Sequence, residues 1–151
     1  MGTYTEIFFR AYVTKKSYDL MNDIHDRGRD AIPQEHSHPF FSTRNAAGLF
    51  YADGSSVFPY ANHYSSHAEP LVYGSGAQYS TIYSVSFRAN LKNYDEEIEK
   101  FFDYISGSVA DEGFMGYSLH EDDVDPCPVL YYSFNEELHV QRSSPLGTYY
   151  R

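Results

Sequence analysis

YSTIYSVSFRANLKNYDEEIEKFFDYISGSVADEGFMGYSLH, residues 79–120, predicts a strand, a helix and a second strand in succession. In its first part, serines and one arginine alternate with larger residues, which is the two-residue period of a strand with one buried and one wetter face. The residues expected on the buried face are Tyr79, Thr81, Tyr83, Val85, Phe87 and Ala89. The pattern predicts a strand over residues 79–89.

A helix is expected to begin near Asn93, which is a suitable N-cap, with Glu96 as its capping-box partner. Acidic residues follow where the helix dipole favours negative charge. One apolar stripe at helical spacing is formed by Tyr94, Ile98, Phe101, Phe102, Ile105 and Val109. Gly107 lies where a left-handed cap is expected, and residues 114–119 predict the next strand.

The first thirty residues share this order of elements. Alternation over residues 6–13 predicts a strand in which Ile7, Phe9, Ala11 and Val13 point one way. Thr14 is suited to cap the helix that follows, and Gly28 lies where that helix should end. The helix would carry Tyr18, Leu20, Met21 and Ile24.

A long connection, residues 29–78, is rich in Pro, Gly, Ser, His and Tyr. Residues 49–52 and 57–60 flank Asp53-Gly54, which predicts a short hairpin. Elsewhere in the segment, regular structure is expected to be broken by Pro33, Pro39, Pro59 and Pro70. Because so long a segment inside a compact domain is usually functional or mobile, we expect the working surface to start here.

The C-terminal part begins with an acidic segment, residues 120–128, that contains two prolines and is expected to be a loop. Residues 129–134 predict a strand, and a turn at residues 135–137 leads into a further strand over residues 138–141. From residue 143 onward we expect a loose tail.

Together these elements predict an α+β fold with a mostly antiparallel sheet and two helices on one face. The order fits a ferredoxin-like split βαβ arrangement, with residues 29–78 as a long irregular insertion between the first helix and the central strand. We therefore expect a single domain over residues 1–142 and a C-terminal tail over residues 143–151.

The charge of the chain bears on its partners, because 21 acidic residues against 11 basic ones give a net charge of −10. This balance opposes direct binding to nucleic acid, where affinity depends on clustered Lys and Arg. It favours docking on a basic protein surface, including one that normally holds nucleic acid, although acidity also serves solubility. The 16 tyrosines and 11 phenylalanines supply aromatic contact residues.

The cellular compartment is predicted from features that the sequence lacks. One cysteine, Cys127, excludes an internal disulfide framework. Residues 1–10 lack the pattern of a signal peptide, and no apolar stretch is long enough to span a bilayer. We expect a cytoplasmic protein without membrane contact.

Histidines in the long connection are the candidate metal ligands. His36, His38, His63 and His67 offer up to four imidazoles, so a zinc or other transition-metal site is one hypothesis. Their spacing matches no known signature, and the neighbouring prolines predict no regular element to hold them. Ordinary surface histidines are the simpler interpretation.

Other reactive centres are not indicated. The chain has no Gly-x-Ser-x-Gly motif, and Cys127 lacks the sequence context of a catalytic cysteine. The acidic loop lacks the glycine and the closing glutamate of a calcium-binding loop. A base-stacking sheet is not favoured, because Tyr79, Tyr83 and Phe87 are expected on the core face.

Three stretches carry a family resemblance: FFSTRN at residues 40–45, LKNYDEEIEKFF at residues 91–102, and Gly116-Tyr117 ahead of the acidic loop and PVLYY at residues 128–132. In these the chain resembles small proteins of bacteriophages and mobile elements. The resemblance covers about half of the chain and brings no catalytic motif. It implies a protein that binds and disables or redirects a host protein, such as a defence nuclease, inside the host cell.

We therefore expect a non-enzymatic binding protein that needs no cofactor. Its expected contact residues are Glu121, Asp122, Asp123 and Asp125 in the acidic loop, with Tyr12, Tyr51, Tyr60, Tyr64 and Tyr73. Two alternatives stay open: a metal-dependent enzyme that uses the histidines, and a virion or assembly component. A homodimer formed through an exposed sheet edge is also compatible with the sequence.

Overall fold

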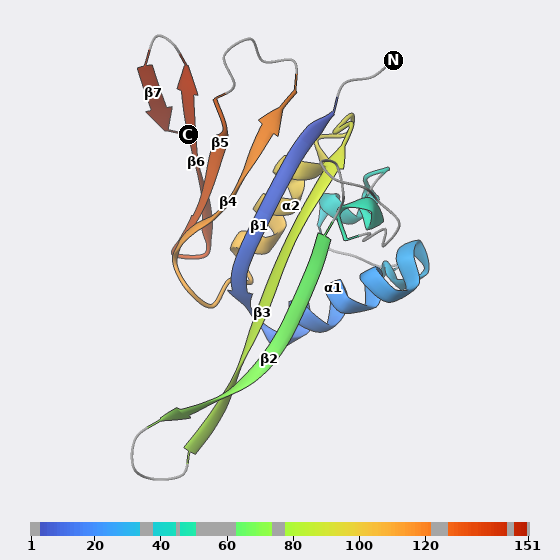
Figure 1. Cartoon of the computed structure of the whole chain (residues 1–151), viewed down its shortest axis with the longest axis vertical. Coiled ribbons are helices and arrows are strands. Elements are labelled where there is room, and N and C mark those ends of the chain that lie inside the picture. Colours follow the sequence, from blue (N-terminus) through green and yellow to red (C-terminus); the bar gives the residue numbers. More distant parts are fainter. Residues whose placement is uncertain are drawn as a thin grey trace.

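A computed structural model describes residues 4–33, 38–44, 46–50, 63–73, 78–121, 127–144 and 147–150. Two helices, α1 (Lys15–Arg27) and α2 (Glu97–Ser106), accompany one open antiparallel sheet (Figure 1). Its strands lie in the order β2-β3-β1-β4-β5-β6-β7. They are β1 (Thr5–Val13), β2 (His63–Tyr73), β3 (Gln78–Leu91), β4 (Gly113–His120), β5 (Val129–Phe134), β6 (Glu137–Ser144) and β7 (Gly147–Tyr150). The expected α+β class with an antiparallel sheet is confirmed.

The elements with the clearest periodicity form where the sequence predicts them. β1 and β3 are neighbours, with Phe9 opposite Phe87, so the buried residues of both strands point to the same side. α1 begins after Thr14, whose side chain accepts a hydrogen bond from the Ser17 backbone N–H. It ends at Gly28, whose φ of 68° is a conformation that glycine adopts without strain.

The start of α2 differs from the prediction. Asn93 and Glu96 both have positive φ, so the helix begins only at Glu97, and Tyr94 is exposed rather than part of the apolar stripe. Asn93 still caps the helix, because its Oδ1 accepts from the Ile98 backbone N–H at 3.0 Å. Its side-chain partner is Glu99 instead of Glu96. Gly107 is the C-cap residue but has right-handed backbone angles, not left-handed ones.

The long connection contains more regular structure than expected. It includes three short 3₁₀ helices, Gly28–Ala31, Pro39–Ser42 and Ala47–Leu49. Leu49 therefore lies in a 3₁₀ helix and not in the first strand of a hairpin, and residues 51–62 lie outside the described part of the chain.

β2 was not predicted, because polar residues lie on both of its faces, with Ser65 and Ser66 consecutive, and because Pro70 interrupts the pattern. It forms as an edge strand beside β3. An edge strand tolerates proline, since half of its N–H groups point away from the sheet.

The expected tail at residues 143–151 is partly strand. β6 continues to Ser144, and Gly147–Tyr150 forms β7, which pairs antiparallel with β6. The sheet thus extends past the boundary drawn at residue 142.

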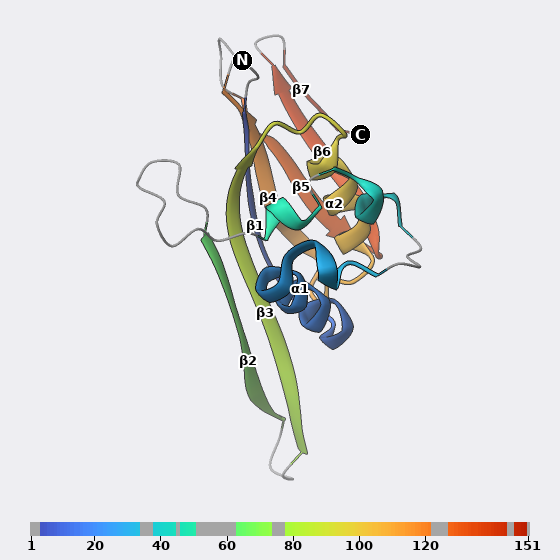
Figure 2. The same ribbon diagram turned by 90° about the vertical axis from the view of Figure 1, so that its right-hand side faces the viewer.

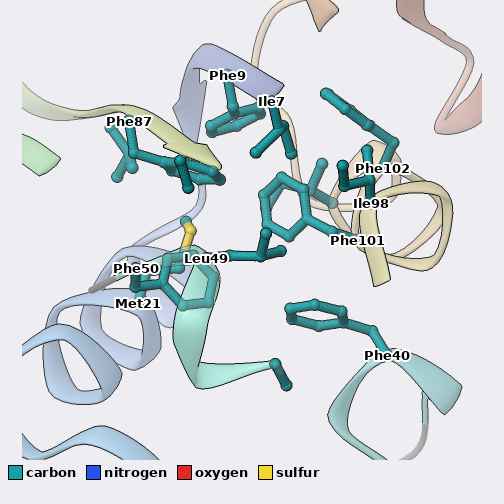
Figure 3. Close-up of a cluster of buried hydrophobic side chains, with 14 of the residues drawn as sticks. Ile7, Phe9, Met21, Phe40, Leu49, Phe50, Phe87, Ile98, Phe101 and Phe102 are labelled. Atoms are coloured by element: carbon teal, nitrogen blue, oxygen red, sulfur yellow. The ribbon is translucent and has the colours of Figure 1, made fainter. Parts of the chain in front are cut away.

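Aromatic side chains dominate the core (Figure 3). Phe101 of α2 contacts Phe9 at 5.1 Å and Phe87 at 5.3 Å between ring centroids, and both contacts are edge-to-face. Phe40 and Phe50 from the long connection also contact Phe101, so this segment completes the core. Such ring pairs contribute about 0.5–1.5 kcal/mol each beyond the burial of apolar area.

A two-stranded arm projects from the sheet (Figures 1 and 2). β1 pairs with β3 only as far as Tyr83, and beyond it residues 78–82 of β3 pair with residues 69–73 of β2. α1 lies beside the root of this arm, where Tyr18 contacts Tyr83 at 5.0 Å between ring centroids.

Candidate partner-binding surface

An interruption in the pairing of β1 with β4 creates a cleft. The two strands pair from Thr5–His120 to Phe9–Gly116 and meet again only at an isolated bridge between Val13 and Val109. Between these points, residues 110–115 face the shorter stretch 10–12. The three additional residues of the segment 110–115 cannot all pair with β1, so the regular hydrogen-bonded pairing of the two strands is interrupted here.

Gly116 explains where the regular pairing stops. A Cβ atom at this position would collide with the backbone carbonyl oxygen of Phe8. The strands therefore approach each other here as only glycine allows, and the register of β4 against β5 shifts between Phe114 and Gly116.

The resulting cleft has a volume of about 430 Å³. We call it the β1–β4 cleft; it is lined by Phe8, Arg10, Ala11, Tyr12, Ser84, Asp111, Glu112, Phe114 and Met115. Phe8, Arg10 and Tyr12 alternate with the buried residues of β1, so they point away from the core. Phe114 is 52% exposed and Tyr12 is 37% exposed, so two aromatic rings stand at the mouth of the cleft.

Aromatic contacts continue from the cleft across the neighbouring strands. Phe114 contacts Tyr132 of β5 at 5.6 Å, and Tyr132 stacks on Phe134 at 6.0 Å between ring centroids. Phe8 stacks on Tyr117, whose hydroxyl donates to the carboxylate of Glu6 at 3.2 Å. Burial and the negative charge of Glu6 raise the pKa of the Tyr117 hydroxyl, which keeps it a neutral donor.

The start of β4 and the turn from β5 into β6 lie at the same end of the sheet (Figure 1). Carboxylates from these segments line the cleft and a neighbouring hollow. Glu112 accepts a hydrogen bond from the Asn135 backbone N–H at 3.0 Å, which joins the two segments. The neighbouring hollow, of about 400 Å³, is lined by Asp103, Glu136 and Glu137. We call this group the acidic end; its members are Asp103, Asp111, Glu112, Glu136 and Glu137, all exposed.

Little positive charge opposes the acidic end. Asp103 pairs with His38 at 2.9 Å, and within the described ranges no Lys or Arg forms a salt bridge with any of the five carboxylates. By contrast, Asp19 and Asp23 on α1 are paired with Lys15 and Arg27.

The turn in the acidic end is strained. Asn135 and Glu136 form the two-residue connection between β5 and β6, with φ of 52° and 63°. Positive φ at both positions suits Asn followed by Gly, so a glutamate in the second position is unfavourable for the backbone. The turn itself lies where the sequence predicts it.

The expected contact tyrosines have different environments. Tyr12 lies at the cleft, whereas Tyr64 packs against α1: its hydroxyl donates to Asn22 at 2.7 Å and its ring stacks on His25 at 4.3 Å. Tyr64 therefore has a structural role and presents little surface to a partner. Tyr73 ends β2. The other two, Tyr51 and Tyr60, lie outside the described residues.

Most of the predicted acidic loop also lies outside the described residues, namely Asp122, Asp123 and Asp125. Glu121 is exposed, and its carboxylate accepts from the Tyr4 backbone N–H at 2.7 Å. It is thus held against the start of β1. The acidic end is separate from this loop and was not predicted as a site.

The candidate metal ligands are spread over different elements. His38 precedes the 3₁₀ helix Pro39–Ser42 and pairs with Asp103 of α2, whereas His63 and His67 lie on β2. Four strand residues span roughly 13 Å, so His63 and His67 are too far apart to bind one ion together. Among the residues that the structure describes, no three His, Cys, Asp or Glu side chains are grouped as a metal site; His36 is not among them.

Sequence reasoning placed Tyr12 among the contact residues but missed the β1–β4 cleft. Asp111, Glu112 and Phe114 lie within four consecutive residues, so the mixed acidic and aromatic character of this segment was visible in the sequence. Their position opposite Arg10 depends on how β4 pairs with β1, which the sequence does not reveal.

Comparison with protein families, with curated proteins and with solved structures found no match to this chain. No helix in the described ranges is both long enough and apolar enough to cross a membrane.

Proposed function

We propose that this protein is a non-enzymatic binding protein that docks on the basic surface of another protein and inhibits or redirects it. The acidic end is the surface that makes this contact. The single observation that carries the proposal is the set of exposed carboxylates at one end of the sheet that lack Lys or Arg partners within the described part of the chain.

Electrostatics supports this proposal. The chain as a whole carries a net charge of −10, which speeds encounter with a positively charged partner. Asp103 lies in the last turn of α2, so the negative end of the helix dipole adds to the potential of the acidic end. Among the residues that the structure describes, Asp111, Glu112, Glu136 and Glu137 have no Lys or Arg salt-bridge partner, so their carboxylates can pair with cations of a partner.

Strain at Glu136 is consistent with a role for its charge. A residue that occupies an unfavourable backbone conformation is often retained because its side chain acts in a functional site. Glycine would relieve the turn but would remove one of the carboxylates.

The proposal extends to the fold that displays this surface. We propose that β1, α1, β2, β3, α2 and β4 form a ferredoxin-like split βαβ unit with both helices on one face. The strand order β2-β3-β1-β4, antiparallel throughout, supports this assignment. β5, β6 and β7 then extend the sheet and supply the turn of the acidic end.

The cellular setting follows from the sequence resemblance. If the chain is encoded by a bacteriophage or mobile element, the basic partner is a host protein, and nucleic-acid-binding defence proteins have such surfaces. The chain would then act in the cytoplasm of the host by occupying the surface that normally holds nucleic acid.

Affinity capture from host lysate tests the proposed function. The wild-type protein is used as bait and is compared with two variants. The acidic-end triple variant carries Asp111→Asn, Glu112→Gln and Glu136→Gln, and the control variant carries Asp19→Asn, Asp23→Asn and Asp26→Asn. Both variants change the net charge equally. We expect the wild type to capture a basic protein that binds the acidic-end triple variant roughly tenfold more weakly. Three exposed ion pairs that contribute about 0.5 kcal/mol each would account for this loss. Equal capture by both variants would exclude the acidic end as the contact surface.

A further inference from the structure

Resting on this proposed function, we infer that the β1–β4 cleft binds an arginine side chain of the basic partner. The guanidinium group stacks between the rings at the mouth of the cleft and pairs with the carboxylates of Asp111 and Glu112, which also line it. The acidic end supplies general attraction, whereas the cleft supplies a specific contact.

The walls of the cleft suit a flat cation. Tyr12 on β1 and Phe114 on β4 lie on opposite sides of the gap, and both are exposed. A guanidinium within about 6 Å of an aromatic ring centroid is attracted to the negative face of the ring.

The charges of the cleft favour a cationic ligand over an anionic one. Asp111 and Glu112 face a single basic residue, Arg10, so the ionised lining carries a net charge of −1. Asp111 makes no hydrogen bond or salt bridge within the described residues, and Glu112 uses one oxygen for Asn135. Free carboxylate oxygens therefore remain to accept from a guanidinium.

Arginine fits this site better than lysine does. Its planar group combines ring stacking with paired hydrogen bonds to a carboxylate, whereas the ammonium of lysine is compact and strongly hydrated. The alternative ligand for an aromatic sheet surface is single-stranded nucleic acid, whose bases stack on exposed rings. Its phosphates would meet Asp111 and Glu112, and Arg10 alone does not compensate for them.

Fluorescence polarisation with labelled hexa-arginine and hexa-lysine peptides tests the inference. We expect the arginine peptide to bind more tightly than the lysine peptide of equal charge. Phe114→Ala should weaken arginine binding by roughly two- to fivefold and leave lysine binding nearly unchanged. Tyr94→Ala, which removes an exposed ring outside the cleft, is the matched control and should change neither affinity.

Arg10→Gln gives an independent test through the sign of its effect. Removing this positive charge should strengthen binding of the arginine peptide, and Asp111→Asn should weaken it. If Arg10→Gln weakens the interaction, the cleft does not hold a cation and the inference is overturned. Binding of an octathymidylate that is lost in Phe114→Ala would overturn it too, in favour of base stacking.

Failure of this inference is distinguishable from failure of the proposed function. Equal affinities for the two peptides, both insensitive to Phe114→Ala but reduced by the acidic-end triple variant, would remove the arginine site and leave the acidic docking surface. No binding of either peptide at low salt would contradict both.

Discussion

Tyr64 shows how a single side chain attaches an edge strand to the body of the protein. Its hydroxyl donates to Asn22 Oδ1 at 2.7 Å, and the same oxygen accepts from the Ser66 hydroxyl at 2.7 Å. Its ring stacks on His25 of α1. Burial raises the pKa of the Tyr64 hydroxyl well above its ordinary value, because the charged phenolate is poorly solvated there.

Tyr64→Phe is expected to lower the free energy of unfolding by about 1 kcal/mol at neutral pH, because it removes one hydrogen bond. Since the pKa is raised on folding, the neutral hydroxyl stabilises the native state fully below about pH 10. This contribution is lost as the pH rises from there towards the raised pKa. Urea unfolding at about pH 7 and pH 10.5 should therefore show a larger alkaline loss for the wild type than for Tyr64→Phe. Tyr12→Phe, at an exposed ring, is the control, and equal losses in all three proteins would refute the assignment.

Glu136 is expected to affect both the stability of the protein, through the strain of its turn, and the binding of a partner, through its charge. Glu136→Gly should raise the free energy of unfolding by about 1 kcal/mol, because glycine adopts the positive φ of the turn without strain. The same variant should bind the captured partner more weakly, because a carboxylate is lost. Glu137→Gln removes a neighbouring charge without relieving the turn, so it should weaken binding with no gain in stability. A Glu136→Gly protein that is less stable than the wild type would contradict this interpretation.

At the level of elements, the pairing of β1 with β4 depends on Gly116. Gly116→Ala should lower the free energy of unfolding by roughly 1–3 kcal/mol, since the new methyl group forces the strands apart. Gly107→Ala is the matched control: a Cβ there meets nothing closer than the Tyr104 carbonyl oxygen at 3.9 Å, so stability should hardly change. Both values come from urea unfolding followed by circular dichroism. Equal stability of the two variants would show that the close approach of β1 and β4 is not required.

The same elements show what the sequence can predict. β1 and β3 were predictable because each buries one face where the two strands pair, although Thr81, predicted on that face, lies in the arm and is exposed. α1 was predictable because Thr14 and Gly28 mark its ends. β2 was not, since an edge strand with serine on both faces and histidine on one has no clear apolar period. The cleft depends on register: six residues of the segment before and into β4 face three of β1, and that mismatch appears only once the strands are paired.

For the molecule as a whole, the position of charge matters more than its amount. The sequence predicted an acidic protein and a basic partner, but it assigned the contact to residues 121–125 and to tyrosines, most of them in the long connection. The structure adds a second acidic surface at the other end of β4, beside an aromatic cleft. On α1, Asp19 and Asp23 are already paired with Lys15 and Arg27, so they contribute less to the attraction of a partner.

The most direct measurement is the affinity of the wild type and of the acidic-end triple variant for the captured partner, by calorimetry between about 0.05 and 0.3 M NaCl. Wild-type affinity should fall steeply with salt, and the deficit of the variant should be largest at low salt and shrink as screening increases. A wild-type affinity that does not change with salt, or a deficit that stays constant across the series, would contradict docking through the acidic end.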